Sequence, residues 1–439
     1  MIMKRDIYQG LISWKKSDTR KPLILQGARQ VGKTYILKEF GKNEYPDTAY
    51  FNFEEDPALN DFFKGKISPV KIIEKLSIYR EKNILPEKTL IIFDEVQNSP
   101  ETLTSLKYFQ EEAGQYHIAA AGSLLGIRIG RYAPFPVGKV NFVNLYPLSF
   151  GEYLDGVGKS GLRRLLQTAA TPEPFELAFH NELLENLRLY YFIGGMPEAI
   201  AQYKHDKDLN KVRTIQTEIL AAYLMDISKH ATKTEAIKIT DIWNSMPGQL
   251  AKENKKFKFS EISENARARD YNESIQWLVQ AGLVYKCFSI KAPKLPLSGY
   301  CEDNIFKLYL LDTGLLGAML DLSQKTIVEG NRLFSEYNGA FTENYVAQEL
   351  IANDHKALYY WTSDNSAEVD FVMPYTDEVF PLEVKAGMSK QKKSLAVFGA
   401  RYGSRVLSMA TLRNFKQDDK VCNYPLYAVS LFPKVHLNQ

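Results

Sequence analysis

The sequence predicts an α/β fold whose first 150 residues build a parallel sheet covered by helices, and three observations support this. Short apolar runs alternate with amphipathic stretches, as they do in α/β domains. A glycine-rich loop follows the first apolar run, at 22–25, and precedes a helix that begins near Lys33. A later run, at 90–93, is continuously apolar like a buried central strand, and two carboxylates follow it.

The other elements are expected in chain order as follows. The four strands of the first region are expected at 22–25, 48–53, 90–93 and 117–121. A helix over 33–40 follows the first strand, and Leu103, Leu106 and Phe109 share one face of a second helix. Helical periodicity then dominates 160–235.

Beyond residue 235 the pattern changes twice. A helix with Ile275 and Leu278 precedes two expected strands, at 283–288 and 306–310, and a helix followed by a hairpin indicates a winged-helix segment. From about residue 325 the pattern is again α/β. The helix is expected over 339–352 and the strands near 357–361, 368–373 and 379–385. The predicted domains are therefore 1–155, 156–235, 236–322 and 323–439.

The composition excludes several classes of protein. A chain of 439 residues is too long for one hydrophobic core, and 45% apolar with 24% charged residues is ordinary for a globular protein. Three scattered cysteines exclude a disulfide-stapled scaffold and favour a reducing compartment. No apolar run reaches the roughly 18–20 residues that cross a bilayer, so we expect a cytoplasmic protein with no membrane partner. A net charge of +3 neither requires nor excludes nucleic acid.

A phosphate-binding loop is the most specific motif in the sequence. Every fixed position of the pattern GxxxxGK[ST] is filled, and the loop consists of Gly27, Ala28, Arg29, Gln30, Val31, Gly32, Lys33 and Thr34. Its glycines let backbone N–H groups point at phosphate oxygens, and the helix that follows adds the positive end of its dipole. We expect Lys33 to reach the β- and γ-phosphates of ATP and Thr34 to ligate Mg²⁺.

Carboxylates and a serine at strand ends complete the predicted catalytic site. Asp94, expected beside the loop of a neighbouring strand, suits a second Mg²⁺ ligand, and Glu95 is the candidate general base for the attacking water. Ser123 ends the next strand and either bonds the water or the γ-phosphate, or forms a plain turn. Arg128 and Arg131 are both candidates for an arginine finger. The combination favours hydrolysis over binding alone.

A second acidic group lies near the C-terminus. Glu343 falls on an expected helix, Asp370 on a strand, and Glu383 and Lys385 on one face of the next strand. A hairpin would bring Asp370 beside Glu383, where two carboxylates hold Mg²⁺ or Mn²⁺ and the lysine orients water, as in nucleases with the D…(E)xK signature. The alternative is an ordinary charged sheet edge.

A basic segment with interleaved aromatic residues precedes the expected hairpin. It contains Lys252, Lys255, Lys256, Phe257, Lys258 and Phe259, and Arg267 and Arg269 follow. These residues suit phosphate contacts beside a winged helix, or form a solvated loop.

Seven short motifs occur together with these residues, at 25–34, 93–97, 121–123, 146–150, 194–199, 223–229 and 312–316. With the C-terminal acidic set, they make almost the whole chain resemble a family of bacterial and archaeal AAA+-class P-loop ATP-binding proteins. That family carries a C-terminal restriction-endonuclease-like domain of unknown function. The resemblance implies an AAA+ core with a parallel sheet, a helical lid, a winged helix and a PD-(D/E)xK-like α/β domain. Two departures stand out: Lys139 replaces the arginine of a glycine-arginine pair, and Val369 replaces the signature proline.

Three functions are compatible with the sequence. The preferred one is Mg²⁺-dependent ATP binding and hydrolysis coupled to remodelling of a nucleic acid or a protein partner. The alternatives are an ATP-regulated metal-dependent nuclease, and an ATP-gated interaction module whose C-terminal domain only binds. The partner, DNA or another protein, and the oligomeric state stay open.

Overall fold

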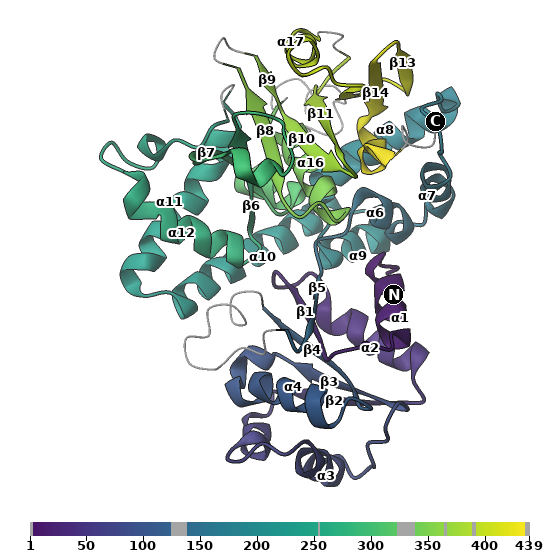
Figure 1. Cartoon of the computed structure of the whole chain (residues 1–439), viewed down its shortest axis with the longest axis vertical. Helices are drawn as coiled ribbons and strands as arrows, with labels where there is room; N and C mark the ends of the chain where they lie inside the picture. The colour runs from purple at the N-terminus through teal and green to yellow at the C-terminus, as the bar shows by residue number, and fades with distance from the viewer. Residues whose placement is uncertain are drawn as a thin grey trace. The chain divides into compact units, whose positions relative to one another are not determined.

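The computed structural model describes residues 3–123, 138–252, 255–322, 339–363, 367–388 and 392–434. The chain forms two compact units (Figure 1). The N-terminal unit comprises residues 4–146 with 280–282, and the C-terminal unit comprises 147–279 with the remainder of the chain. Among the helices of the described residues, none is long and apolar enough to cross a membrane.

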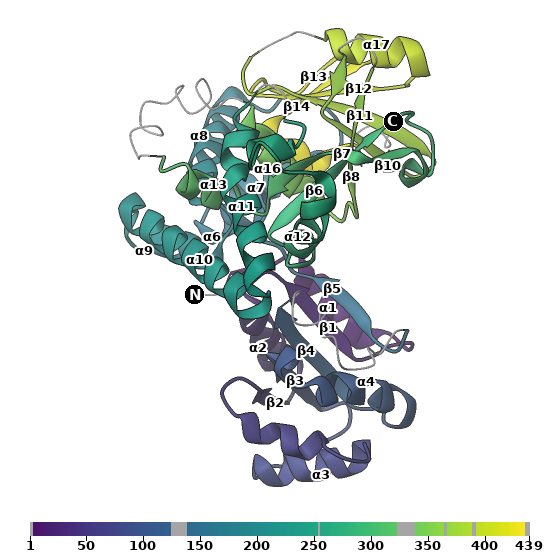
Figure 2. The same cartoon turned by 90° about the vertical axis from the view of Figure 1, so that its left-hand side faces the viewer.

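The N-terminal unit is built on a five-stranded parallel sheet in the order β2-β3-β4-β1-β5. Its strands are β1 (Leu23–Gly27), β2 (Asp47–Asn52), β3 (Thr89–Asp94), β4 (His117–Ser123) and β5 (Asn141–Asn144). Its helices are α1 (Ile7–Lys16), α2 (Lys33–Glu44), α3 (Pro69–Tyr79) and α4 (Pro100–Glu112). Figure 2 shows α2 and α4 on opposite faces of the sheet, as right-handed crossovers in opposite directions require.

Burial along the strands follows their place in the sheet. Central strand β3 is buried at every position, whereas edge strand β2 is buried only at alternate positions, so one of its faces is partly open. Four strands therefore lie where the sequence predicts them. Strand β5 is not among the predicted strands; its four residues, NFVN, are too short and too exposed to give a clear pattern.

Among the described residues of the C-terminal unit, seven α-helices precede its first strand. They are α6 (Phe150–Gly156), α7 (Ser160–Gln167), α8 (Leu177–Ile193), α9 (Pro197–Asp206), α10 (Leu209–His230), α11 (Lys233–Leu250) and α12 (Ala268–Gln280). Its first helix begins with a capping box, in which Ser149 and Glu152 bond each other's backbone N–H. This region is helical as predicted, while its role as a lid stays a prediction.

Two further sheets follow. One has the order β7-β6-β8-β9 and the other β10-β11-β12-β14-β13. The strands are β6 (Val284–Ile290), β7 (Cys301–Leu310), β8 (Leu358–Thr362), β9 (Glu368–Val369), β10 (Phe371–Tyr375), β11 (Glu378–Val384), β12 (Leu407–Thr411), β13 (Lys416–Asp418) and β14 (Val421–Pro425). The helices are α13 (Thr313–Met319), α16 (Ala340–Ala352) and α17 (Lys393–Tyr402).

The expected hairpin at 283–310 is present, but a winged helix is not confirmed. Strands β6 and β7 are antiparallel, and β6 also pairs in parallel with β8 along Cys287–Ile290. The hairpin therefore belongs to a sheet that it shares with β8 and β9. The division of the chain into four domains stays a prediction.

A buried carboxylate connects two of the short motifs, those at 194–199 and 312–316. Asp312 is fully buried and accepts hydrogen bonds from the backbone N–H groups of Gly195, at 2.5 Å, and Leu315, at 3.0 Å. A Cβ atom at Gly194, where φ is +73°, would lie 2.2 Å from Asp312 Oδ1. Only glycine fits there, because the residue has a left-handed φ and touches the carboxylate.

Candidate functional site

The phosphate-binding loop joins the end of β1 to the start of α2. A Cβ atom at Gly27 would lie 2.2 Å from the backbone oxygen of Leu145, so this position accepts only glycine. Gly32 has a φ of +95° and Gln30 a φ of +64°, which turns the chain sharply before α2 begins at Lys33. The loop thus has the tight backbone that the motif predicts.

Contacts within the N-terminal unit hold the loop in place. Arg5 is buried and donates to the backbone oxygens of Val31, at 3.0 Å, and Tyr146, at 2.6 Å. Lys33 is buried and donates to the backbone oxygens of Gly27, at 3.1 Å, and Ala28, at 2.8 Å. The Lys33 ammonium therefore lies inside the curve of the loop, where phosphate oxygens bind in such loops.

Asp94 meets the loop directly, although its strand is not adjacent to β1. The sequence placed Asp94 on a strand neighbouring the loop, but β4 lies between β1 and β3. The Thr34 hydroxyl, on α2, nevertheless donates to Asp94 Oδ2 at 2.7 Å, because α2 packs over β3 and β4. Asp94 is 2% exposed. Hydroxyl and carboxylate oxygens in contact are a donor set that suits Mg²⁺.

Tyr50, on edge strand β2, is a member of this site that sequence reasoning missed. Its hydroxyl donates to the same Asp94 Oδ2 at 2.8 Å, and the Lys38 ammonium lies 3.6 Å from the centre of its ring. Burial and the hydrogen bond to Asp94 raise the pKa of Tyr50, so the phenol keeps its proton. The alternating pattern of β2 gave the only sequence signal, since it puts Tyr50 and Asn52 on one face.

Glu95 follows Asp94 in a left-handed backbone conformation, with a φ of +50°. Its backbone N–H donates to Asp94 Oδ1 at 3.0 Å, and its carboxylate accepts a hydrogen bond from the Gln97 side-chain amide. A non-glycine residue with positive φ is strained, and such strain concentrates at functional sites.

The other predicted residues of this site are placed less fully. Ser123 ends β4, and its backbone pairs with Gly27, so β4 reaches the loop between β1 and β3. Arg128 and Arg131 lie outside the described residues. Lys139, which replaces the arginine of the glycine-arginine pair, is 41% exposed and pairs with Glu111 at 2.9 Å.

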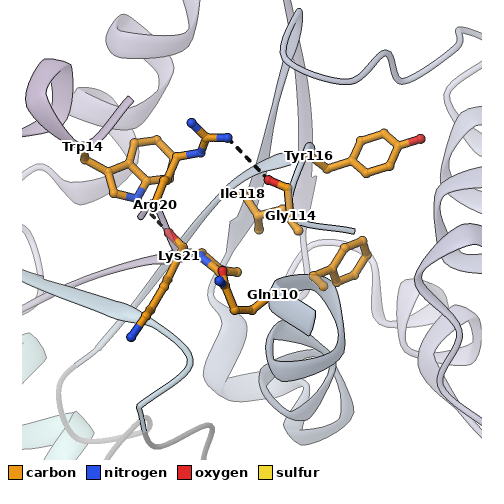
Figure 3. Close-up of a pocket in the computed structure, with 9 residues that line it drawn as sticks. Trp14, Arg20, Lys21, Gln110, Gly114, Tyr116 and Ile118 are labelled. Carbon is orange, nitrogen blue, oxygen red and sulfur yellow. Dashed lines mark hydrogen bonds between the residues drawn. The ribbon is translucent and has the colours of Figure 1, made fainter. Parts of the chain in front are cut away.

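A separate hollow lies at the opposite, amino-terminal end of the same sheet (Figure 3). Trp14, Arg20, Gly114 and Ile118 are among the residues that line it, and Arg20 bonds the Gly114 backbone oxygen at 3.4 Å. It has no room for a water molecule. We therefore do not regard it as a ligand site.

The C-terminal acidic residues come together, but three lysines accompany them. The lysine–carboxylate cluster consists of Lys255, Lys307, Lys385, Glu343, Glu368, Asp370 and Glu383. Sequence reasoning did not include Lys255, Lys307 or Glu368 in this site. Among the described residues, no group of three or more histidines, cysteines and carboxylates is arranged to hold a metal ion.

The predicted strand at 368–373 is split at the cluster. Asp370 separates β9, which pairs with β8, from β10, which pairs with β11. The β10–β11 pairing places Asp370 next to β11, where its Oδ2 accepts from the Val384 backbone N–H at 2.8 Å. The hairpin therefore brings Asp370 to Glu383 as the sequence predicts.

Two lysines of the basic segment form ion pairs. Lys252 pairs with Glu261 and is 49% exposed, whereas Lys255 pairs with Glu343 and is 8% exposed. Lys255 is thus not a solvated group awaiting a phosphate, and the expected nucleic-acid contact is not established for this segment.

Comparison with known proteins assigns the N-terminal unit to a class. Residues 19–154 match the family model of an AAA domain. With the parallel sheet and the phosphate-binding loop, this match defines an AAA+-like P-loop ATPase fold. Residues 184–326 and 338–429 match two domains of unknown function (DUF8612 and DUF4143). No curated protein matches the chain.

Several solved structures are similar at low identity. A Walker-type ATPase of Pyrococcus abyssi is 14% identical over 73% of this chain and 96% of that chain, with a TM-score of 0.45. The Orc1 protein of Aeropyrum pernix, in complex with DNA, is 12% identical over 72% and 90%, with a TM-score of 0.29. The RuvB Holliday junction branch migration motor of Thermotoga maritima is 11% identical over 64% and 89%, with a TM-score of 0.29. At these scores, they identify no function.

Proposed function

We propose that this chain binds ATP with Mg²⁺ at the Gly27–Thr34 loop and hydrolyses it. The contact between Thr34 and Asp94 carries the proposal, because it joins the two motifs that a P-loop ATPase needs into one site. Thr34 and Asp94 are 60 residues apart in sequence, and the fold brings their side chains into contact.

Each residue has a defined role in the proposed reaction. Loop N–H groups and the Lys33 ammonium bind the phosphates, and Thr34 and Asp94 hold Mg²⁺. The bound cation neutralises charge that develops on the phosphates. Glu95 takes a proton from the attacking water, and Ser123, whose backbone pairs with Gly27 at the end of β4, orients that water or the γ-phosphate. Lys33 and Thr34 position the γ-phosphate for attack.

We further propose that hydrolysis is coupled to the remodelling of a nucleic acid or a protein partner. The support is the connection of the ATPase fold to a much larger C-terminal unit, which comprises most of residues 147–434. Phosphate release measured with and without DNA separates the two kinds of partner. Stimulation by DNA supports nucleic acid, whereas unchanged turnover at saturating DNA favours a protein.

Titration calorimetry tests ATP binding. We expect one ATP per chain, bound more tightly with Mg²⁺ than with EDTA, and a large loss of affinity in Lys33→Ala. Lys64→Ala is the matched control, since Lys64 is 67% exposed and pairs with Asp61 at the surface. Undiminished affinity in Lys33→Ala would contradict the proposal.

A further inference from the structure

The lysine–carboxylate cluster joins parts of the C-terminal unit that are far apart in sequence. Lys307 lies on β7, Glu343 on α16, Glu368 on β9, and Glu383 on β11. Helix α16 packs against β7, β8 and β11 (Figure 1), so these elements converge on one buried place. Lys255 comes from the segment before α12, outside the region that matches the C-terminal family model.

Lys307 occupies the centre of the cluster. Its ammonium lies 2.6 Å from Glu368 Oε1, 3.5 Å from Glu343 Oε2 and 3.8 Å from Asp370 Oδ1. The Lys307 side chain is 1% exposed, so it has no route into solvent without movement of the strand. A fixed cation therefore already stands among three of the four carboxylates.

Two further lysines each reach one more carboxylate oxygen of the cluster. Lys255 is in direct contact with Glu343 Oε1, and Lys385 lies 2.6 Å from Glu383 Oε1. Tyr309 also donates to Glu343 Oε2, at 3.1 Å. Ammonium groups therefore contact both oxygens of Glu343.

The positions of the ammonium groups conflict with a divalent cation. Mg²⁺ and Mn²⁺ need several open oxygen ligands around one point, and Mg²⁺ binds them at about 2.0–2.1 Å. Both oxygens of Glu343 already contact ammonium groups, and Glu383 Oε2 is the buried carboxylate oxygen of the cluster without a hydrogen-bond partner among the described residues. A cation that bound Asp370 and Glu343 would lie within a few ångströms of the Lys307 ammonium and would be repelled by it.

We propose that Lys255, Lys307 and Lys385 offset most of the negative charge of this cluster in place of a divalent cation, so that it clasps the segment at 255–258 and the β6–β7 hairpin onto α16. The cluster is then a structural clasp and not the metal site of a nuclease. This conclusion does not depend on ATP hydrolysis by the N-terminal unit.

Manganese titration of the full-length, nucleotide-free chain tests the proposal directly. Electron paramagnetic resonance measures free Mn²⁺ as the metal is added to wild type and to Asp370→Asn. We expect the two proteins to bind the same amount of Mn²⁺, because no ion binds at the cluster. One equivalent bound by wild type and lost in a folded Asp370→Asn variant would overturn the proposal.

Thermal unfolding with and without Mn²⁺ provides the second test. Lys307→Met leaves carboxylates buried without their cation, so we expect its unfolding temperature to fall by about 5 °C or more. Mn²⁺ should restore part of this loss in Lys307→Met while leaving wild type unchanged. Lys416→Met, which removes a 62%-exposed lysine from a surface pair, is the control and should shift little.

A milder variant keeps the test decisive if Lys307→Met does not fold. Lys255→Met removes only the ammonium from the segment at 255–258, and Glu343 keeps Lys307 and Tyr309. We expect a lower unfolding temperature and faster proteolysis of that segment than in Lys416→Met. Wild-type stability and wild-type proteolysis in Lys255→Met would refute the clasp.

Discussion

Removal of the Tyr50 hydroxyl isolates one contact of the proposed Mg²⁺ site. Asp94 Oδ2 accepts from both Thr34, at 2.7 Å, and Tyr50, at 2.8 Å. When Thr34 turns its oxygen to a bound cation, Tyr50 remains to hold the carboxylate in position. Tyr50→Phe keeps the ring and its contact with Lys38, and removes only the hydroxyl. We expect weaker Mg²⁺ binding with little change in the fold.

The size of the effect follows from the type of hydrogen bond. A bond to a charged group contributes about 1.5–3 kcal/mol net. Because Tyr50 is only half-buried, we take the lower end of that range. About 1.5 kcal/mol corresponds to a roughly tenfold change in an equilibrium constant. The Mg²⁺ concentration for half-maximal ATP turnover should therefore rise about tenfold.

The assay is phosphate release at saturating ATP over a range of Mg²⁺ concentrations. ATP affinity in EDTA should stay at the wild-type value, which separates a positioning role from damage to the loop. Tyr79→Phe is the matched control, because Tyr79 bonds Asp56 on the surface of α3 and should leave the Mg²⁺ dependence unchanged. An unaltered Mg²⁺ dependence in Tyr50→Phe would refute the positioning role.

Two further predictions concern other carboxylates. Glu95→Gln should bind ATP normally but release phosphate about 10²–10⁴-fold more slowly, since a general base contributes that much; turnover at the parent rate would place the base elsewhere. Burial raises the pKa of Asp312 to about 6, despite hydrogen bonds from Gly195 and Leu315. The folded state therefore binds the proton more tightly than the unfolded state, and this stabilisation is complete below about pH 4 and is lost as pH rises through about 6. Between these pH values the free energy of unfolding of wild type, measured with denaturant, should fall by about 3 kcal/mol, whereas that of Asp312→Asn should not. Identical pH profiles for the two proteins would contradict this prediction.

The sequence predicts most of the ATP site because its determinants are local. The Gly27–Thr34 loop needs glycines at fixed positions, and a short apolar run in the sequence predicts a buried strand. The order of the strands in the sheet, by contrast, is not determined by local sequence. Nothing within β3 or β1 indicates that β4 lies between them, and Tyr50 joins Asp94 only because β2 pairs with β3 in one register.

The C-terminal cluster shows why the remainder was harder to predict. The carboxylates fit a sequence signature with a known spacing, whereas no signature relates the positions of Lys307 and Lys255 to those carboxylates. Lys307 reaches Asp370 only because β6 pairs with β8, which joins the hairpin to the C-terminal strands. Pairings between distant segments set such contacts, and residue periodicity carries no information about them.

Phosphate release from ATP by the full-length chain, compared between wild type and Lys33→Ala, tests the central claim most directly. The proposed function predicts Mg²⁺-dependent turnover in wild type and none above background in Lys33→Ala, since the loop loses the ammonium that lies within it. Turnover by Lys33→Ala at the wild-type rate, with the fold intact by circular dichroism, would contradict it.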